Sequence, residues 1–301
     1  MPFTLSHAAA VLPAVRADGS GRARLVPAVL VSGSFAPDMT YYAASAVPGA
    51  MGFGDVTHSV AGVFTVDVLV AWLLTALWLL VREPLVALAP RERQGPVAAL
   101  TRCGAPRARV RPPLLLWWYV SAAPGALTHV VWDAFTHHGR WGVRLFPVLG
   151  GTVAGSPLYR CLQYGGSVVA AGVIAVFVGR ALRRAPSCGP TGVPVLSVRV
   201  RWWAGVLVGG CALAAAARRA TVWWDGRGPR DELWEVVPTV CFGAGAGLAA
   251  GLLGYAVAVR VRRPAAPGPG GTGAPNAEAE AEAEAAAAAA VSVVPGGPPT
   301  R

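Results

Sequence analysis

The stretch from Val60 to Val81 constrains this chain more than any other part of its sequence. Its residues, VAGVFTVDVLVAWLLTALWLLV, include one charged side chain, Asp67. An α-helix rises about 1.5 Å per residue, so a run of this length covers the ~30 Å hydrocarbon core of a bilayer. We therefore predict a transmembrane helix here. For Asp67 we favour a polar contact with a neighbouring helix over a proton or ion site.

Other apolar runs repeat this pattern along the chain. Four more predicted spans are Pro113–Trp132, Tyr164–Leu182, Trp202–Thr221 and Val236–Val259. The segment Leu25–Val47 is also apolar, but Pro37-Asp38 interrupts it, so it is either a full span or a half-helix that re-enters. The sequence thus predicts an all-α, polytopic membrane bundle of about five or six transmembrane helices. Residues 1–263 would form this domain, with a motif-bearing half (1–180) and supporting helices (181–263).

Composition agrees with lipid as the solvent. The chain is 54% hydrophobic and 14% charged, whereas a soluble domain has about 25% charged residues. The formal charge of +11 is carried by arginine, but the arginines cluster at the ends of apolar blocks, so we do not expect nucleic acid as a partner. The five cysteines contain no CxxC pair, which argues against a disulfide framework or a cysteine zinc site.

Loop arginines predict the orientation. They are concentrated in three regions, residues 82–111, 180–201 and 260–263. The positive-inside rule predicts that these regions are cytoplasmic in a multi-pass membrane protein. Residues 264–301 are a low-complexity Pro/Gly and Ala/Glu tract, for which we predict a disordered cytoplasmic C-terminal tail.

The last predicted span carries a stripe of glycines at steps of four, Gly243, Gly247 and Gly251. Such a stripe lets another helix approach closely. We favour packing within the chain, and a homo-oligomer contact is the alternative.

Histidines and aspartates gather in the first half of the chain. All five histidines precede residue 139. His129 and Asp133 are four residues apart, so they share one face of a helix. His58, and Asp38 if Leu25–Val47 spans, would lie on the same non-cytoplasmic side. His137 and Asp55 are secondary candidates.

Imidazole and carboxylate are ligands of the zinc type. Three interpretations stay open: a divalent metal site, a structural polar network, and a transport pathway. Common catalytic patterns (GxSxG, HExxH, the P-loop, GxGxxG) are missing from any suitable context in the sequence.

Five segments carry a family resemblance. They are MPFTLSHAAAVLP at the start, SGSFAPD, THS at 57–59, GALTHVVWDAFTHHGRWGVR at 125–144 and PLYRCLQYGGSVV at 157–169. Over about residues 1–180 the chain resembles the bacterial membrane proteins catalogued as domain of unknown function 4184. The resemblance implies a multi-pass protein of the bacterial cytoplasmic (inner) membrane. The chain is also distantly similar to membrane-bound, metal-dependent hydrolase-like proteins. That similarity implies His7, Asp38, His58, His129 and Asp133 as metal ligands.

Three functional hypotheses follow. The first is a metal-dependent, hydrolase-like protein at the membrane that holds one divalent ion, zinc by preference. The alternative is a non-enzymatic scaffold or assembly protein whose His/Asp cluster is structural, and a transporter ranks third. One conflict concerns His7, because a full crossing by Leu25–Val47 would place it on the opposite side from His58 and His129.

Overall fold

The protein is an all-α membrane bundle, as the sequence predicts. A computed structural model describes residues 3–103, 112–186, 192–226, 228 and 236–262. Among these, five helices are long and apolar enough to cross a membrane: α6 (Val66–Leu88), α8 (Pro112–Thr136), α10 (Leu158–Arg184), α11 (Val198–Gly226) and α12 (Val236–Arg262). The tail predicted at 264–301 lies outside the described residues, so the predicted domain boundary stays a prediction.

The first span begins later than its apolar run. The Ser59 hydroxyl accepts a hydrogen bond from the Gly62 amide and caps a short helix, α5 (Val60–Phe64). Thr65 then leaves the helical conformation, with φ −129° and ψ −85°. The spanning helix is therefore Val66–Leu88, although the sequence predicts Val60–Val81. Hydropathy did not reveal the start of α6, because the break at Thr65 interrupts an otherwise apolar run.

The segment Leu25–Val47 does not form one continuous helix. It contains α2 (Pro27–Phe35), a 3-10 turn, η3 (Ala36–Asp38), and α3 (Met39–Ala43). The nine residues of α2 rise about 13 Å, less than half of the hydrocarbon core. Pro37 lies in the first turn of η3, and a proline there cannot continue the hydrogen-bond ladder of α2. Of the two interpretations, the structure has the broken helix.

Two glycines let α2 and α8 cross closely. A Cβ atom on Gly33 would lie 2.3 Å from the carbonyl oxygen of Ala122, and one on Gly125 would lie 2.3 Å from that of Leu30. Real Cβ atoms do not approach so near, so only glycine fits at either place. The crossing fixes how α2 meets the middle of α8.

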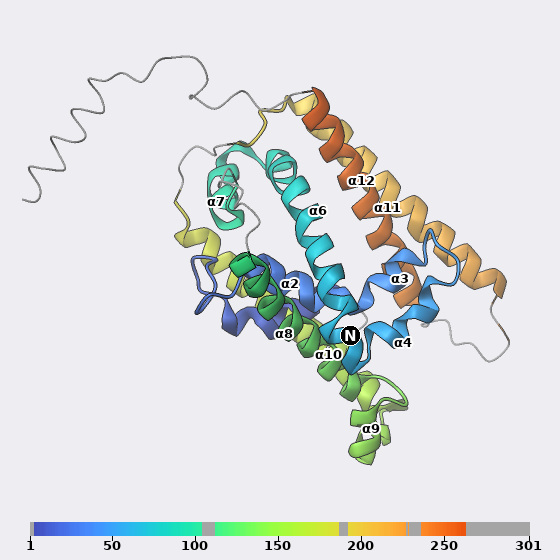
Figure 1. The fold of residues 1–301 in the computed structure, drawn as a ribbon. Helices are drawn as coiled ribbons and strands as arrows, with labels where there is room; N and C mark the ends of the chain where they lie inside the picture. The colour runs from blue at the N-terminus through green and yellow to red at the C-terminus, as the bar shows by residue number, and fades with distance from the viewer. Residues whose placement is uncertain (1–2, 104–111, 187–191, 227, 229–235, 263–301) are drawn as a thin grey trace, which may run out of the picture. The chain divides into compact units, whose positions relative to one another are not determined.

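The glycine stripe of α12 packs on α11, and the two helices run side by side in Figure 1. A Cβ atom on Gly247 would lie 2.1 Å from the carbonyl oxygen of Cys211, and one on Gly251 would lie 2.9 Å from Cα of Val208. The stripe thus has a partner within the chain, as the favoured interpretation predicts. The homo-oligomer contact stays a prediction.

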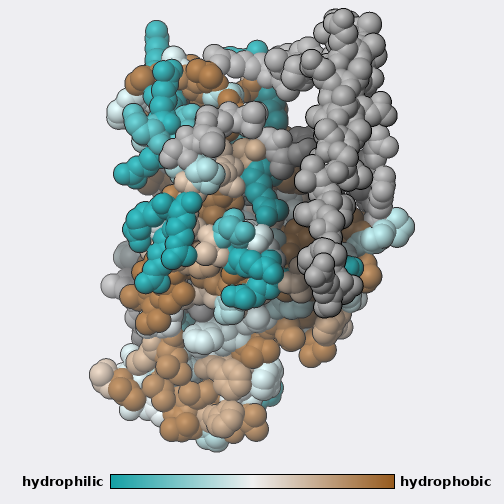
Figure 2. Space-filling view, turned by 90° about the vertical axis from the view of Figure 1, so that its left-hand side faces the viewer, coloured by the Kyte–Doolittle hydropathy of each residue, from teal (hydrophilic) through white to brown (hydrophobic). Residues whose placement is uncertain are grey.

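The remaining elements are short, and they precede the first span or connect later ones. They are η1 (Thr4–His7), α1 (Ala8–Val11), η2 (Leu12–Ala14), η4 (Ala50–Phe53), α4 (Gly54–Thr57), α7 (Arg91–Thr101), α9 (Trp141–Leu145), η5 (Pro147–Gly150), and the antiparallel pair β1 (Thr152–Val153) and β2 (Ser156–Pro157). On the face drawn in Figure 2, the strongly hydrophilic side chains lie in the upper and middle parts, with hydrophobic ones between them, and hydrophobic side chains dominate the lowest part. The strongly polar surface is therefore concentrated toward one end of this face.

Candidate metal centre

Four side chains from three separate segments converge in the interior. Asp38 ends η3, His58 follows α4, and His129 and Asp133 lie one turn apart on α8. One ligand atom from each lies within 4.8 Å of the others, and all four residues are buried. Buried ionisable groups are costly unless they are paired or hold an ion.

Both histidines of this cluster are oriented by backbone carbonyl groups. Nδ1 of His129 donates to the oxygen of Ser34 (2.8 Å), and Nδ1 of His58 donates to the oxygen of Gly54 (2.9 Å). A carbonyl oxygen only accepts, so each Nδ1 carries a hydrogen. In its neutral form each ring therefore presents the lone pair of Nε2 to the centre of the cluster, the arrangement typical of metal-binding histidines.

The spacing around these nitrogens is too long for hydrogen bonds and short enough for a shared cation. Nε2 of His129 lies 3.4 Å from Oδ1 of Asp38 and 3.4 Å from Oδ2 of Asp133. Nε2 of His58 lies 3.7 Å from each of the same two oxygens. Hydrogen bonds between N and O measure about 2.7–3.2 Å, whereas ligands 2.0–2.1 Å from a tetrahedral zinc are roughly 3.3 Å apart.

The Nε2 atom of His129 is the most informative atom of the cluster. Nε2 of His129 is fully buried and has no hydrogen-bond partner in the described part of the chain. A buried polar atom without a partner is costly, by about 1–3 kcal/mol. A cation between this nitrogen and the two carboxylates would remove that cost, so the donor set fits a divalent ion.

Other polar groups hold the ligands in place. The hydroxyl of Thr4 donates to Oδ2 of Asp38 (2.5 Å), which leaves Oδ1 facing the two histidines. The hydroxyl of Thr57 donates to the carbonyl oxygen of Pro37 (2.8 Å). The Thr-His-Ser and Pro-Asp segments are therefore tied directly to each other, and Asp38 and His58 are positioned as a pair.

The glycine crossing of α2 and α8 sets the position of His129. Gly125 lies one turn before His129, on the same face of α8. Because Gly125 packs against α2, the next turn of α8 brings His129 to the end of α2. Ser34 directly follows Gly33, and its carbonyl oxygen is the one that orients the ring.

His7 lies beside the four-residue cluster. Its ring stacks on that of His129, with centroids 3.6 Å apart and an interplanar angle of 12°. Its Nε2 is 3.5 Å from Oδ1 of Asp133, the side chain is 1% exposed, and neither ring nitrogen has a hydrogen-bond partner among the described residues. The conflict over His7 disappears, because the broken segment returns the N-terminus to the same place as His58 and His129.

Burial and neighbouring charges set the protonation of the outer histidines in opposite directions. Burial, reinforced by the nearby His129, holds the pKa of His7 well below its usual value. Burial also lowers the pKa of His58, but contact with the carboxylates of Asp133 and Asp38 outweighs it, and the net shift is upward. His7 is therefore a neutral imidazole, whereas His58 is a ring for which a proton and a cation would compete.

The secondary candidates lie further out. Nδ1 of His137 is 3.6 Å from Oδ1 of Asp133, but Nε2 bonds to the Gln163 amide (2.8 Å) and the side chain is 34% exposed. Asp55 is exposed on α4 and does not join the four-residue group. Neither residue directs a ligand atom into the cluster.

Sequence reasoning missed two parts of the site. A pattern of side chains does not report the backbone carbonyl groups of Ser34 and Gly54. Thr4 lies in one of the segments that carry the family resemblance, but the sequence predicts no role for it. Asp67 differs from its predicted environment. It is fully buried, and neither carboxylate oxygen has a hydrogen-bond partner in the described part of the chain. The predicted polar helix contact for Asp67 is not found there.

Fold and site together define a class: a polytopic membrane protein with a buried His/Asp cluster at the start of its helical bundle. The family model described as a domain of unknown function, DUF4184, matches residues 1–257. The chain belongs to this family, and the match extends well beyond the quoted segments. Searches of curated proteins and of solved structures find no match.

Proposed function

We propose that this protein is a metal-dependent, hydrolase-like protein that holds one divalent ion, zinc by preference. Asp38, His58, His129 and Asp133 would be the ligands. One observation carries the proposal: two carbonyl-anchored histidines direct their Nε2 atoms at the same two carboxylate oxygens, at 3.4–3.7 Å. Mixed imidazole and carboxylate donors suit zinc.

The surrounding residues support hydrolytic chemistry. A bound zinc ion would supply Lewis-acid activation at this site. His7 is neutral and buried, with Nε2 3.5 Å from Asp133, so it is placed to accept a proton from a reacting group and to hand it on. Thr4 would keep Asp38 in one orientation throughout.

The location favours an amphiphilic substrate. The cluster includes residues of the spanning helix α8 and lies among helices apolar enough for a bilayer. A lipid-like or cell-envelope molecule is the substrate class that reaches such a site from the membrane. The arginine distribution supports a cytoplasmic C-terminus, and the proposed location is the bacterial inner membrane that the family resemblance implies.

The alternative is a structural cluster in a scaffold or assembly protein. Two protonated histidines would balance the charges of two carboxylates, and the same distances are within reach of ion pairs. Buried charge networks of this kind can be retained for specificity without catalysis. The two functions differ in whether the full chain carries a metal.

Elemental analysis of the purified full chain in detergent tests the proposal. We expect about one zinc or other divalent ion per chain, lost in His129→Ala and Asp133→Ala and kept in the exposed control Asp55→Ala. If the wild-type protein holds no metal, and His129→Ala merely lowers its melting temperature, the structural alternative is correct.

A second experiment tests catalysis itself. The metal-loaded chain is incubated with amphiphilic carboxylic and phosphoric esters, and product release is followed. We expect turnover that a chelator abolishes and that His7→Gln lowers at unchanged metal content. A metal-loaded protein without turnover of either ester class would leave the ion a structural role.

A further inference from the structure

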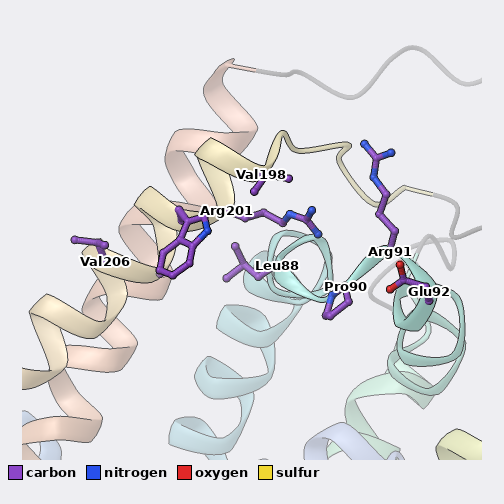
Figure 3. Close-up of a pocket in the computed structure, with 9 residues that line it drawn as sticks. Leu88, Pro90, Arg91, Glu92, Val198, Arg201 and Val206 are labelled. Carbon is purple, nitrogen blue, oxygen red and sulfur yellow. The ribbon is translucent and has the colours of Figure 1, made fainter.

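A cavity separate from the metal cluster lies at the other end of α6. Its volume is about 620 Å³, and it opens where the turn from α6 to α7 meets the first turns of α11 (Figure 3). The lining residues are Leu88, Pro90, Arg91, Glu92, Val198, Arg201, Trp202, Gly205 and Val206. None of these residues belongs to the cluster, so the cavity calls for its own explanation.

One end of the cavity is basic. Arg91 begins α7 and Arg201 lies in the first turn of α11, so two distant segments each contribute a guanidinium group. Nη1 of Arg201 donates to the carbonyl oxygen of Ala89 (3.2 Å), and Figure 3 shows its side chain reaching from α11 toward the end of α6. An arginine has five N–H donors, so this bond positions Arg201 and leaves donors for an anion.

Among the residues that the structure describes, positive charge exceeds negative charge at this end of the cavity. Glu92 is the one acid in the lining, against two arginines, and neither arginine forms an ion pair with any described residue. Guanidinium groups bind phosphate with paired, charge-assisted hydrogen bonds. The basic end therefore suits a phosphate group.

The other end of the cavity is apolar and open to lipid. Trp202 is 72% exposed and Val206, one turn further along α11, is 56% exposed. Only 11% of the apolar stretch of α11 is buried within the chain, so this face of the helix meets hydrocarbon. A bound molecule would have its anionic group at Arg201 and its hydrocarbon along Val206.

We propose that this cavity binds an anionic glycerophospholipid. The phosphate would lie between Arg91 and Arg201, the interfacial ring of Trp202 beside the glycerol region, and one acyl chain along Gly205 and Val206. Such basic pockets between spanning helices suit acidic lipid head groups, and tryptophan favours the depth at which they lie. The lipid would join α6 and α7 to α11. This assignment does not depend on the proposed metal chemistry.

A substitution at Gly205 tests whether a lipid occupies the apolar end of the cavity. Gly205 lines the cavity and a Cβ atom there meets no other atom within 4 Å, so we expect the larger side chain of Gly205→Phe to occupy space that the acyl chain would need. Gly210 is equally open and does not line the cavity, which makes Gly210→Phe a matched control. For the basic end, exposed Arg91 is changed in Arg91→Gln, and Arg199→Gln removes the same charge from the same region outside the cavity.

The experiment uses the full chain in detergent with photoactivatable phosphatidylglycerol, followed by mapping of the label. We expect labelling of the peptide around residues 198–206 at least tenfold above that by photoactivatable phosphatidylcholine. Arg91→Gln should weaken this labelling about fivefold, as ~1 kcal/mol per basic side chain implies. Gly205→Phe should abolish it, and both control variants should change it less than twofold.

Three results would overturn the proposal. One is equal labelling by the zwitterionic lipid, which would indicate a plain hydrocarbon surface. Another is competition by inorganic phosphate alone as effective as competition by lipid, which would indicate a site for free anions. The third is labelling that rises tenfold when residues 264–301, with their four glutamates, are deleted, because that tail would then be the occupant.

Discussion

Close contacts at glycines occur both between α2 and α8, which position the site, and between α11 and α12, but they have different roles in the two regions. Both rely on glycines that let helix backbones touch. At Gly33 and Gly125 the contact brings a carbonyl oxygen to His129, whereas at Gly247 and Gly251 it joins two apolar helices. Close packing thus positions a side chain of the site in the first case, and it holds two membrane-spanning helices together in the second.

The two regions also differ in how far the protein covers them. In the apolar stretches of α6 and α8, 39% and 33% of the residues are buried, against 11–17% in α10, α11 and α12. Protein therefore covers a larger share of α6 and α8, whereas α10, α11 and α12 leave more of their surface to lipid. Damage to the first region should reach the site, and damage to the second should not.

The largest expected effect comes from Gly125→Leu. A side chain there collides with the oxygen of Leu30 and the amide of Ser34, so α2 must move away from α8. We expect the unfolding free energy to fall by about 3 kcal/mol or more, at the upper end for overpacking, with loss of bound metal. Thermal denaturation and metal content measure both, and Gly172→Leu, on open α10 surface, should change neither.

Gly247→Leu should separate stability from the site. It forces α12 away from Cys211 on α11, at a cost of about 1–3 kcal/mol, measured as a lower melting temperature in detergent. Metal content should stay at the wild-type level, and Gly254→Leu, which points into open space, is the control. A loss of metal in Gly247→Leu would mean that the two regions are not independent.

Thr4→Val tests whether a residue that only supports a metal ligand affects the affinity for the metal. The change keeps the shape of the side chain but removes the hydroxyl that orients Asp38. Loss of such a supporting hydrogen bond typically weakens metal binding about 10–100-fold, which competition with a chromophoric chelator would reveal. Thr65→Val, at an exposed position, should leave the affinity unchanged, and an unchanged affinity in Thr4→Val would remove Thr4 from the site.

The smallest effect should be a gain in stability. Asp67 is buried without a hydrogen-bond partner, so Asp67→Val removes a polar group that costs free energy where it stands. We expect stabilisation of about 1 kcal/mol, seen as a higher melting temperature with unchanged metal content. Destabilisation, or a loss of metal, would indicate that Asp67 takes part in the site.

Much of this architecture could be predicted from the sequence. Long apolar runs with few charges identify five spans, because lipid tolerates little else. The spacing of His129 and Asp133 places both on one helix face. The break at Thr65 was not predictable, since it depends on the cap formed by Ser59 within a continuous apolar run.

The convergence of the site was harder to foresee. Nothing in the spacing of His7, Asp38 and His58 says that they meet at α8, because that depends on how the broken segment packs. The resemblance to known motifs suggested the set, and the structure supplies its reason in the carbonyls of Ser34 and Gly54. Those groups belong to the backbone, which sequence patterns do not report.

The break at Pro37 also affects how the chain enters its membrane. Among the described residues, α6 is the first helix along the chain that is long and apolar enough to cross a membrane. Asp38 and His58 leave the ribosome before α6, but His129 and Asp133 follow only with α8. Asp38 and His58 therefore lack the other two residues of the cluster until α8 inserts beside α2. The insertion of α8 and the assembly of the four-residue cluster are therefore one event.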